Sequence, residues 1–422
     1  MAGASKYCDY LVKEVSYGSR QCAGIASSRV ELMYRALGFS YVYLVQPSND
    51  PTLYALKKIR CPFGQESVAQ ALKEVEAYSL FSPHPNIIHA IDHSVESDKG
   101  GDAGQKTVYI LLPYYRRGNL QDAINANLVN RAHFPERRLM VLFLGVCRAL
   151  KAMHHYKVKG APGGEGARRK AKKVRQEAAE ADREAEEEVM QANTRRKRRE
   201  PEEEDNNEQE PLMEGEVMAA QDGVAEGGLR SYAHRDIKPG NIMIADTGTQ
   251  PILMDLGSLV PSPTPITSRA LALQVQDQAA EHSTMPYRAP ELFDVKTCTV
   301  IDGKVDIWSL GCTLYACLVG KSPFEARSEE TGGSLSLCVL GGDWRFPDEG
   351  PAEAKRGKQR VVDAEQSGQR KDDVISAPIK EIVRACLQVE PTERPDIDQL
   401  IGMVEGLVER LPDDGDAALD ME

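Results

Sequence analysis

Hydrophobic and polar residues alternate in two short segments near the N-terminus. Residues 41–45 and 52–59 show the period-two pattern of half-buried strands, and residues 47–51 (Pro-Ser-Asn-Asp-Pro) form a turn between them. A continuous apolar run at residues 108–112 predicts a short buried strand, while residues 66–81 have helical periodicity. The N-terminal part of the chain therefore predicts a small sheet with one helix.

Helical periodicity dominates the rest of the chain. Two more short strands are predicted at residues 242–244 and 252–254, and the polar stretch 343–376 is predicted to be a long loop. The helices are marked by apolar stripes at Leu139/Leu142/Phe143/Val146/Leu150/Met153, Ile307/Leu310/Leu314/Leu318, Ile379/Ile382/Val383/Cys386 and Ile397/Leu400/Ile401/Val404. Strands followed by helices predict an α+β fold with two unequal lobes.

Residues 157–230 differ in composition from the sequence on both sides. They include 15 Lys and Arg and 19 Asp and Glu, and they contain no Phe, Tyr, Trp or Ile. Such a segment cannot bury enough apolar surface to offset the entropy lost on ordering, although residues 167–192 have the composition of a solvated helix. We interpret the segment as a disordered insertion rather than a linker between domains, because the motifs on its two sides belong together.

Charge and cysteine usage exclude several classes of protein. The 422 residues carry 52 Lys and Arg against 64 Asp and Glu, and this net charge of −12 argues against nucleic acid as the main partner. The longest apolar stretch, Leu139 to Cys147, is too short to cross a bilayer, and the N-terminus lacks the layout of a secretory signal. Nine scattered cysteines without a CxxC pair favour reduced thiols over disulfides or a zinc site.

The strongest chemical signal is the run His-Arg-Asp-Ile-Lys-Pro-Gly-Asn at residues 234–241, followed by Asp255-Leu-Gly. Phosphoryl transfer needs a carboxylate to orient a hydroxyl and oxygen ligands to hold Mg²⁺ against the phosphates. Asp236 suits the first task, and Asn241 and Asp255 suit the second. Lys238 would meet the transferred phosphate. A chance acidic turn followed by an unrelated Asp-Leu-Gly is the alternative, and eight specified positions make it weak.

With these motifs the sequence resembles the eukaryotic protein kinases. Tyr-Ala-Leu-Lys at residues 54–57 is similar to the strand-end motif whose lysine grips the ATP phosphates. The resemblance implies that a glutamate of the next helix pairs with Lys57. Glu74 and Glu76 both qualify, and the spacing to the His-Pro-Asn-Ile run at residues 84–87 favours Glu74.

The resemblance also implies the other parts of a kinase site. ATP and Mg²⁺ would be the cofactors, and the hinge that receives adenine would lie at Leu112, Pro113, Tyr114 and Tyr115. The remaining residues implied to line the nucleotide are Gly38, Ser40, Val42 and Ala55 together with Lys57. Glu291 of Ala-Pro-Glu would form a buried ion pair with Arg394, and Asp306 would support the catalytic loop without being a catalyst.

Further motifs narrow the resemblance to the Numb-associated kinases. They are Met-Asp-Leu-Gly-Ser at residues 254–258, Ala-Leu-Ala-Leu-Gln at 270–274, and Thr-Met-Pro-Tyr-Arg-Ala-Pro-Glu-Leu-Phe at 284–293. The best match is the acylated branch on Golgi and, in fungi, vacuolar membranes. This resemblance implies serine and threonine of protein substrates as acceptors, Thr284 near Asp236, and a monomer that is cytoplasmic or peripheral on those membranes, with no nucleic acid as partner.

The resemblance also sets the expected domain boundaries. Residues 1–30 would be a variable N-terminal segment and residues 31–410 a protein kinase domain, with a small β-rich N-lobe at about 31–112 and a larger helical C-lobe at about 116–410. The insertion at 157–230 would interrupt the C-lobe, and residues 411–422 would form an acidic tail.

The Gly-rich loop departs from the family pattern. Kinases cover the ATP phosphates with glycines because a backbone without β-carbons can approach closely. The family has Leu-Gly-Glu-Gly-Gly before Phe39, whereas this chain has Tyr-Arg-Ala-Leu-Gly, with Arg35 and Leu37 in place of the first two glycines. An altered or wrongly predicted exon joint is one explanation, and a pseudokinase or scaffold with weakened ATP binding is the other. The intact later motifs favour the first.

Membrane attachment is the second departure. Ala2 follows Met1, so the myristoylation pattern is absent, and Cys8 and Cys22 remain as candidates for acylation. A basic run at residues 195–199 fits a solvated charge run best, with anionic lipid binding or nuclear import as alternatives.

Overall fold

The computed structural model describes residues 10–12, 31–35, 40–47, 51–62, 65–97, 106–157, 229–349 and 375–412. The chain divides into two compact units, one made of residues 1–156 and 230–422 and the other of residues 157–229. Gly38, Cys8 and Cys22 lie outside the described residues, as do nearly all of the charged insertion and of the acidic tail. The architecture below is that of the first unit.

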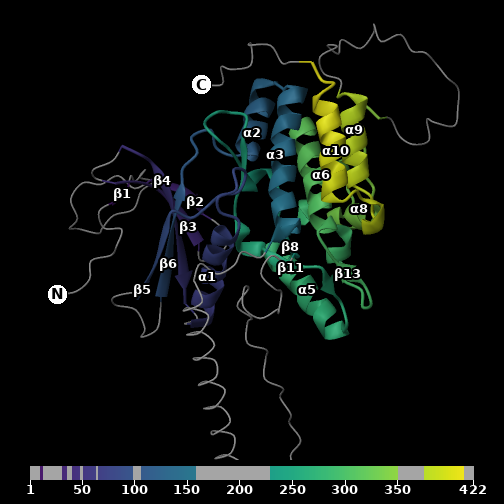
Figure 1. The fold of residues 1–422 in the computed structure, drawn as a ribbon. Coiled ribbons are helices and arrows are strands. Elements are labelled where there is room, and N and C mark those ends of the chain that lie inside the picture. The colour runs from purple at the N-terminus through teal and green to yellow at the C-terminus, as the bar shows by residue number, and fades with distance from the viewer. Residues whose placement is uncertain are drawn as a thin grey trace, which may run out of the picture. The chain divides into compact units, whose positions relative to one another are not determined.

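A six-stranded antiparallel sheet forms the N-lobe (Figure 1). Its central path runs β1-β3-β4-β6-β5, and β2 also pairs with β3. The strands are β1 (Tyr10–Val12), β2 (Glu31–Arg35), β3 (Ser40–Pro47), β4 (Tyr54–Cys61), β5 (Asp92–Ser97) and β6 (Lys106–Pro113). The strands expected at residues 41–45, 52–59 and 108–112 are therefore present.

Two separate strands share one edge of β3. Val12 pairs with Val45, and Glu31 pairs with the neighbouring residue Leu44, so β1 and β2 occupy consecutive positions along the same partner. β1 lies in the segment that the sequence analysis placed before the kinase domain. The chain thus contributes a part of its first 30 residues to the sheet, which the irregular hydrophobic pattern of that segment did not indicate.

Helix α1 (Gln65–Leu80) packs on the sheet through one apolar face. Val68, Ala71, Val75 and Tyr78 recur at helical spacing and are all buried. Glu74 lies among them with only 6% of its surface exposed, although a carboxylate is costly to bury without partners. A carboxylate buried on an otherwise apolar face requires hydrogen-bond or ion-pair partners inside the protein.

The C-lobe is built around one buried helix. Helix α6 (Lys304–Val319) is buried along its whole length from Val305 to Cys317, and it packs against α3 and α9, which are seen beside it in Figure 1. The other helices are α2 (Leu120–Asn130), α3 (Glu136–His154), α5 (Arg269–His282), α7 (Pro323–Thr331), α8 (Leu335–Gly341), α9 (Ala377–Cys386) and α10 (Ile397–Val408). The four helices expected from apolar stripes are α3, α6, α9 and α10.

Short strands lie between these helices in the chain and form three small sheets. They are β7 (Tyr156–Lys157), β8 (Leu229–Ala233), β9 (Ile242–Ile244), β10 (Pro251–Leu253), β11 (Val260–Ser262), β12 (Thr264–Pro265) and β13 (Val300–Ile301). β9 and β10 form a hairpin in which Ile242 pairs with Leu253. Residues 241 and 255, just outside this hairpin, are therefore brought to the same end of it.

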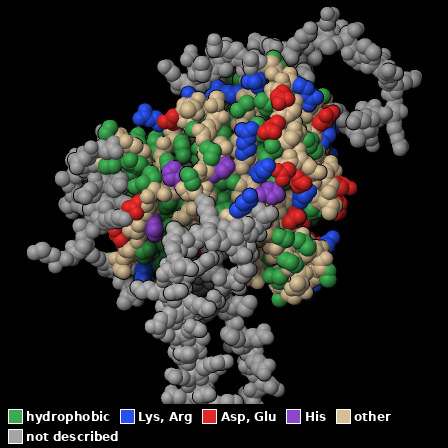
Figure 2. Space-filling model, viewed as in Figure 1, with side chains coloured by type: hydrophobic (Ala, Val, Ile, Leu, Met, Phe, Trp, Pro, Cys, Tyr) green, Lys and Arg blue, Asp and Glu red, His purple; other side chains and the backbone are tan. Residues whose placement is uncertain are grey.

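Charged side chains of both signs are mixed over the helical face in Figure 2. Two of the ion pairs join α3 to α10, from Arg148 to Glu405 (3.0 Å) and from Lys151 to Asp398 (2.7 Å). Exposed pairs of this kind contribute little stability each, about 0.2–1 kcal/mol. Among the described residues, no helix is both long and apolar enough to cross a membrane.

Candidate active site

The catalytic loop lies between β8 and β9 and holds Asp236 in a fixed orientation. One oxygen of its carboxylate, Oδ2, accepts hydrogen bonds from Lys238 Nζ (2.7 Å) and Asn241 Nδ2 (3.0 Å). The other, Oδ1, accepts from the amide (2.9 Å) and the hydroxyl (2.7 Å) of Thr284. Lys238 Nζ also donates to Thr284 Oγ1 at 2.7 Å. The structure thus brings together Asp236, Lys238, Asn241 and Thr284.

Asp306 supports this loop from inside the C-lobe. Its side chain is fully buried on α6, where Oδ2 accepts the amide of His234 (2.9 Å) and Oδ1 accepts the amide of Arg235 (2.8 Å). His154, in the last turn of α3, lies 3.0 Å from the same Oδ2. Burial alone would raise the pKa of Asp306, but His154, His234 and the hydrogen bond from the Arg235 amide together outweigh it and leave the pKa below the ordinary value for aspartate.

Backbone strain occurs at two positions of this site. Arg235 and Asp255 have φ values of 67° and 59°, in the left-handed region that non-glycine residues seldom adopt. Such conformations cost about 1–3 kcal/mol and persist only where the surroundings enforce them. At Arg235 the enforcing contact is the hydrogen bond from its amide to Asp306.

Lys57 of β4 joins the two lobes. Its Nζ lies 2.6 Å from Glu74 Oε1 on α1 and 3.3 Å from Asp255 Oδ1, which is 198 residues away along the chain. Burial alone would lower the pKa of Lys57, but the carboxylates of Asp255 and Glu74 outweigh it and raise the pKa above the ordinary value for lysine. Glu74 is thus the buried partner of Lys57, whereas Glu76 is exposed.

Asp255 and Asn241 offer the oxygen ligands that Mg²⁺ takes. The side chain of Asp255 is 41% exposed, and the Lys57 ammonium lowers the pKa of its carboxyl group although desolvation opposes the shift. Asn241 uses its amide nitrogen to donate to Asp236, which leaves its side-chain oxygen as an acceptor. Among the described residues, no group of three or more His, Cys, Asp and Glu could hold a metal ion. These two ligands fit Mg²⁺, which is usually completed by water and substrate phosphates.

The other expected nucleotide-contacting residues lie on the sheet and just after it. Val42 pairs with Lys57 across β3 and β4, and Ala55 pairs with Leu112 across β4 and β6. Pro113 ends β6 and has no N–H, so it offers adenine only a carbonyl oxygen, and a backbone donor would have to come from Tyr114 or Tyr115. Ser40 begins β3, where its hydroxyl is buried without a partner among the described residues.

A family comparison identifies the fold that carries this site. The model described as "Protein kinase domain" matches residues 38–159 and 229–404, which together make up more than half of the chain. The chain belongs to the protein kinase family. The expected two-lobed α+β kinase fold is confirmed, and the 157–230 segment falls almost entirely in the gap between the two matched ranges.

Several curated kinases are similar over nearly their whole length. "Serine/threonine-protein kinase ppk13" of Schizosaccharomyces pombe is 30% identical, with 91% of each chain covered. "Serine/threonine-protein kinase ENV7" of Saccharomyces cerevisiae is 31% identical over 90% of this chain and 91% of the relative. The human "Serine/threonine-protein kinase 16" is 29% identical over 88% and 87% of the two chains.

The segment that follows Asp255 in this kinase is anchored at its C-terminal end by two contacts. Glu291 receives two hydrogen bonds from the buried Arg394 guanidinium, at 2.7 and 2.8 Å. Ser309 of α6 donates to the carbonyl of Tyr287 (2.8 Å), which fixes the short turn after Thr284. α5 precedes these two anchors, so the segment that leads to Thr284 is itself helical.

Sequence reasoning missed two residues of the kinase site. The Tyr78 hydroxyl donates to the same Glu74 oxygen that Lys57 contacts, and burial together with the nearby Glu74 raises its pKa well above the ordinary value for tyrosine. His154 supports Asp306 as described above. Tyr78 follows Glu74 by four residues, which places both on one face of α1, so the helical spacing contained this signal.

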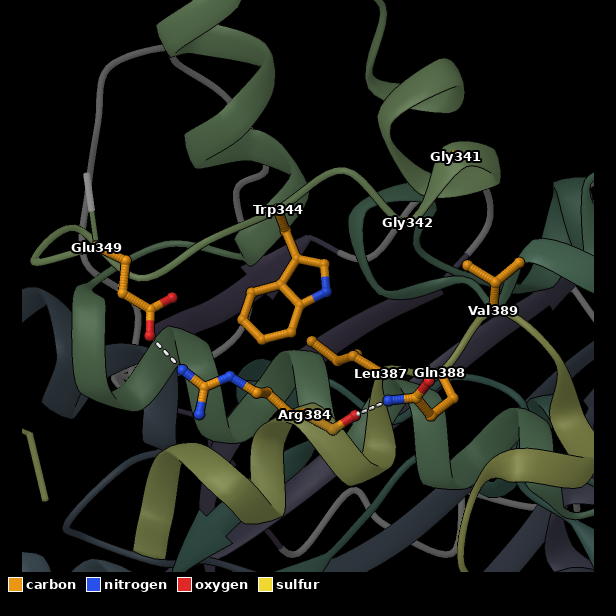
Figure 3. Close-up of a pocket in the computed structure, with 8 residues that line it drawn as sticks. All are labelled: Gly341, Gly342, Trp344, Glu349, Arg384, Leu387, Gln388 and Val389. Atoms are coloured by element: carbon orange, nitrogen blue, oxygen red, sulfur yellow. Dashed lines mark hydrogen bonds and ion pairs between the residues drawn. The ribbon is translucent and has the colours of Figure 1, made fainter. Parts of the chain in front are cut away.

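A separate pocket of about 340 Å³ lies in the C-lobe of the kinase (Figure 3). Arg384 forms an ion pair there with Glu349, and Gln388 donates to the carbonyl of Arg384 at 2.8 Å. The complete lining is Gly341, Gly342, Trp344, Glu349, Arg384, Leu387, Gln388 and Val389. It includes none of the residues around Asp236, so the pocket is distinct from the candidate active site.

Proposed function

We propose that this protein is a serine/threonine protein kinase that transfers the γ-phosphate of ATP to hydroxyl groups of protein substrates. The observation that carries the proposal is the convergence on Asp236 of Lys238, Asn241 and Thr284 from two segments about 45 residues apart. A carboxylate with four donors around it is oriented to accept a hydroxyl proton, which is the task of the base in this reaction.

Each of the other residues has a role in the proposal. Lys57, held by Glu74, would contact the α- and β-phosphates of ATP, and Lys238 would stabilise charge on the transferred group. Asn241 and Asp255 would hold Mg²⁺, which neutralises phosphate charge when bound.

The wall of the nucleotide site completes the proposal. Val42 and Ala55 would lie against adenine, and the backbone from Leu112 to Tyr115 would offer it hydrogen bonds. Gly38 and Ser40 would lie near the phosphates.

The acceptor class is supported by two features. Lys238 of the catalytic loop contacts both Asp236 and Thr284, and a lysine at this position is what the resemblance to serine/threonine kinases implies; the curated relatives are also named serine/threonine kinases. Phosphoamino-acid analysis of labelled protein substrate would test this assignment. Phosphotyrosine as the main product would overturn it.

We do not favour the pseudokinase alternative, because every proposed catalytic side chain is present and contacts its partners. The decisive experiment measures transfer of labelled phosphate from Mg-ATP by the wild-type protein and by Asp236→Asn. We expect incorporation by the wild type and a loss of at least about 10³-fold in the variant. Asp398→Asn is a matched control, since it removes a carboxylate that pairs with Lys151 on the surface. Equal activity of wild type and Asp236→Asn would refute the proposal.

Cellular location is a further part of the proposal. The resemblance to the acylated branch of Numb-associated kinases implies attachment to Golgi or vacuolar membranes at their cytoplasmic side. Fractionation of the full chain with Cys8 and Cys22 intact or replaced by serine tests this. Recovery of both forms in the soluble fraction would contradict it.

A further inference from the structure

Arg288 is a buried cation whose side-chain hydrogen bonds go to neutral oxygens. Only 7% of its surface is exposed, and a buried guanidinium is costly unless its donors are satisfied. Arg394 is paired with Glu291, whereas Arg288 forms no ion pair with a carboxylate of the described residues. Its Nε donates to Ser283 Oγ (2.7 Å), and its Nη2 donates to the carbonyls of Ser283 (2.9 Å) and Ala280 (3.4 Å). A positive charge is thus kept inside the protein next to two backbone carbonyls and one hydroxyl.

These oxygens lie at the C-terminal end of α5. Ser283 follows the last helical residue, and its hydroxyl also donates to the carbonyl of Ala279 (2.6 Å). The last carbonyls of a helix lack intrahelical donors and carry a partial negative charge, so a cation at this end is favourable. Arg288 therefore fixes the backbone at the point where α5 ends and the turn containing Thr284 begins.

The peptide group between Ser283 and Thr284 joins Arg288 to Asp236. Its carbonyl oxygen accepts from Arg288 Nη2 (2.9 Å), and its N–H donates to Asp236 Oδ1 (2.9 Å). A trans peptide group is planar and directs its carbonyl and its N–H to opposite sides, so a contact that holds one end sets the direction of the other. A cation at the carbonyl also polarises the group, which strengthens the hydrogen bond that the N–H donates.

The charges of Arg288 and Asp236 also interact. Burial lowers the pKa of Arg288, and the negative charge of Asp236 opposes this shift. The hydroxyl of Thr284 donates to the same carboxylate oxygen as its amide, Oδ1 (2.7 Å), while Lys238 and Asn241 of the catalytic loop contact Oδ2. The two donors that hold Oδ1 therefore belong to the residue whose backbone Arg288 fixes.

We infer that Arg288 is a positioning residue of the phosphate-transfer site, which holds the peptide group between Ser283 and Thr284 so that Thr284 orients Asp236. This inference rests on the proposed kinase function and adds a residue that acts through the backbone instead of touching substrate. None of the hydrogen bonds of the Arg288 side chain goes to a residue proposed to bind the nucleotide. Loss of the guanidinium should therefore slow the transfer step and leave ATP binding in place.

Steady-state kinetics of Arg288→Gln test this role, with ATP and a protein substrate both varied. Glutamine removes the charge and the planar fork of donors. We expect kcat to fall about ten- to hundred-fold, as the loss of a charge-assisted hydrogen bond would cause, while KM for ATP stays within about two-fold of the wild-type value. Rates are compared under conditions in which urea unfolding shows both proteins to be folded. If Arg288→Gln does not fold, Arg288→Lys takes its place with an expected fall of about three- to ten-fold, because lysine keeps the charge but has one nitrogen for three oxygens.

Two further variants separate this role from simpler ones. Ser283→Ala removes the hydroxyl that accepts from Arg288 Nε and keeps the carbonyl, so its kcat should fall less than that of Arg288→Gln. Arg410→Gln is the matched control, because Arg410 also donates through Nε to a carbonyl in the last turn of a helix, that of Gly406 in α10 (2.7 Å). It should keep the wild-type kcat.

Nuclear magnetic resonance of the Thr284 amide tests the inference without phosphate transfer. In the full chain labelled with ¹⁵N-threonine, the signal of Thr284 is identified by its loss in Thr284→Ser. A hydrogen bond to a carboxylate moves an amide proton to low field, so the weaker bond in Arg288→Gln should move this signal to higher field. Arg410→Gln should leave the signal where it is in the wild type.

Three results would overturn the inference. The first is a kcat that Arg288→Gln leaves unchanged, with or without a rise in KM for ATP. The second is a fall in kcat from Ser283→Ala as large as that from Arg288→Gln, which would assign the effect to the hydroxyl. The third is a Thr284 amide signal that Arg288→Gln does not move. Absence of transfer by the wild type would instead refute the proposed kinase function, and the amide signal would then decide whether Arg288 holds this peptide group.

Discussion

Replacing Tyr78 by phenylalanine tests whether its hydroxyl positions the Lys57–Glu74 pair. The hydroxyl is buried and donates to Glu74 Oε1, the oxygen that also lies 2.6 Å from Lys57. The raised pKa of Tyr78 keeps this group protonated, and therefore a donor, at neutral pH. Tyr78→Phe removes one oxygen atom and leaves the ring packing in place.

The expected magnitude follows from the strength of the hydrogen bond. A hydrogen bond to a charged group contributes about 1.5–3 kcal/mol and one between neutral groups about 0.5–1.5 kcal/mol, and because Glu74 keeps Lys57 as a partner we expect a loss of stability between these ranges, about 1–2 kcal/mol. If loss of this hydrogen bond destabilises the ATP-binding position of Lys57 by the same amount of about 1–2 kcal/mol, kcat/KM for ATP should fall by about 5- to 30-fold. Urea unfolding measures the first quantity, and initial rates at varied ATP concentration measure the second.

Tyr315→Phe is the matched control. The Tyr315 hydroxyl donates to the carbonyl of Arg345 (2.7 Å) inside the C-lobe, far along the chain from the Lys57 pair. Its loss should cost about 0.5–1.5 kcal/mol of stability without changing the ATP kinetics. If both variants lose stability while Tyr78→Phe keeps the wild-type kcat/KM for ATP, the hydroxyl has only a structural role and our reasoning is wrong.

Three further predictions concern the N-lobe and pH. Replacing Arg35 and Leu37 by glycine should tighten Mg-ATP binding about three- to ten-fold, because a backbone without β-carbons approaches phosphate more closely, and calorimetry that found equal affinity would exclude this. Deleting residues 13–30 should leave the melting temperature within about 3 °C of the wild-type value, because β1 and β2 already pair with the consecutive residues Val45 and Leu44 of β3. A larger fall in melting temperature would contradict this pairing of β1 and β2 with β3. Because the pKa of Asp255 is lowered in the folded state, its ionised carboxylate stabilises the protein above a pH of about 4, and this stabilisation is lost as the pH falls through the folded-state pKa. Asp255→Asn should therefore make the free energy of unfolding, measured by urea titration at several pH values, depend less on pH in the acid range. An unchanged pH dependence would refute this.

The sequence predicted the strands and helices with strong periodicity and missed the elements with weak patterns. α5 is the clearest example of a missed helix. Its buried face consists of Ala272, Val275 and Ala279, and two small alanines give little hydrophobic contrast. The Ser268 N-cap, whose hydroxyl accepts the amide of Leu271, was the local signal that the segment begins a helix.

The residues of the candidate site also divide into those that the sequence predicted and those that it missed. Asp236, Asn241 and Asp255 were predicted because their type and spacing are dictated by chemistry. Tyr78 and His154 act through other residues, and their importance depends on which side chains tertiary packing places beside them. The approach of Lys57 to Asp255 is also tertiary, since 198 residues separate the two. No local pattern in a single sequence contains that information.

The complete burial of Asp306 links folding to catalysis. One carboxylate ties α6 to the backbone amides of His234 and Arg235, so a molecule that has formed its helical core has its catalytic loop in place as well. Loss of Asp236 should abolish turnover and leave a folded protein, whereas loss of Asp306 should reduce the amount of protein and the activity of each molecule together. A mutational scan that measures cellular abundance separately from phosphate transfer would therefore divide these two aspartates into different classes.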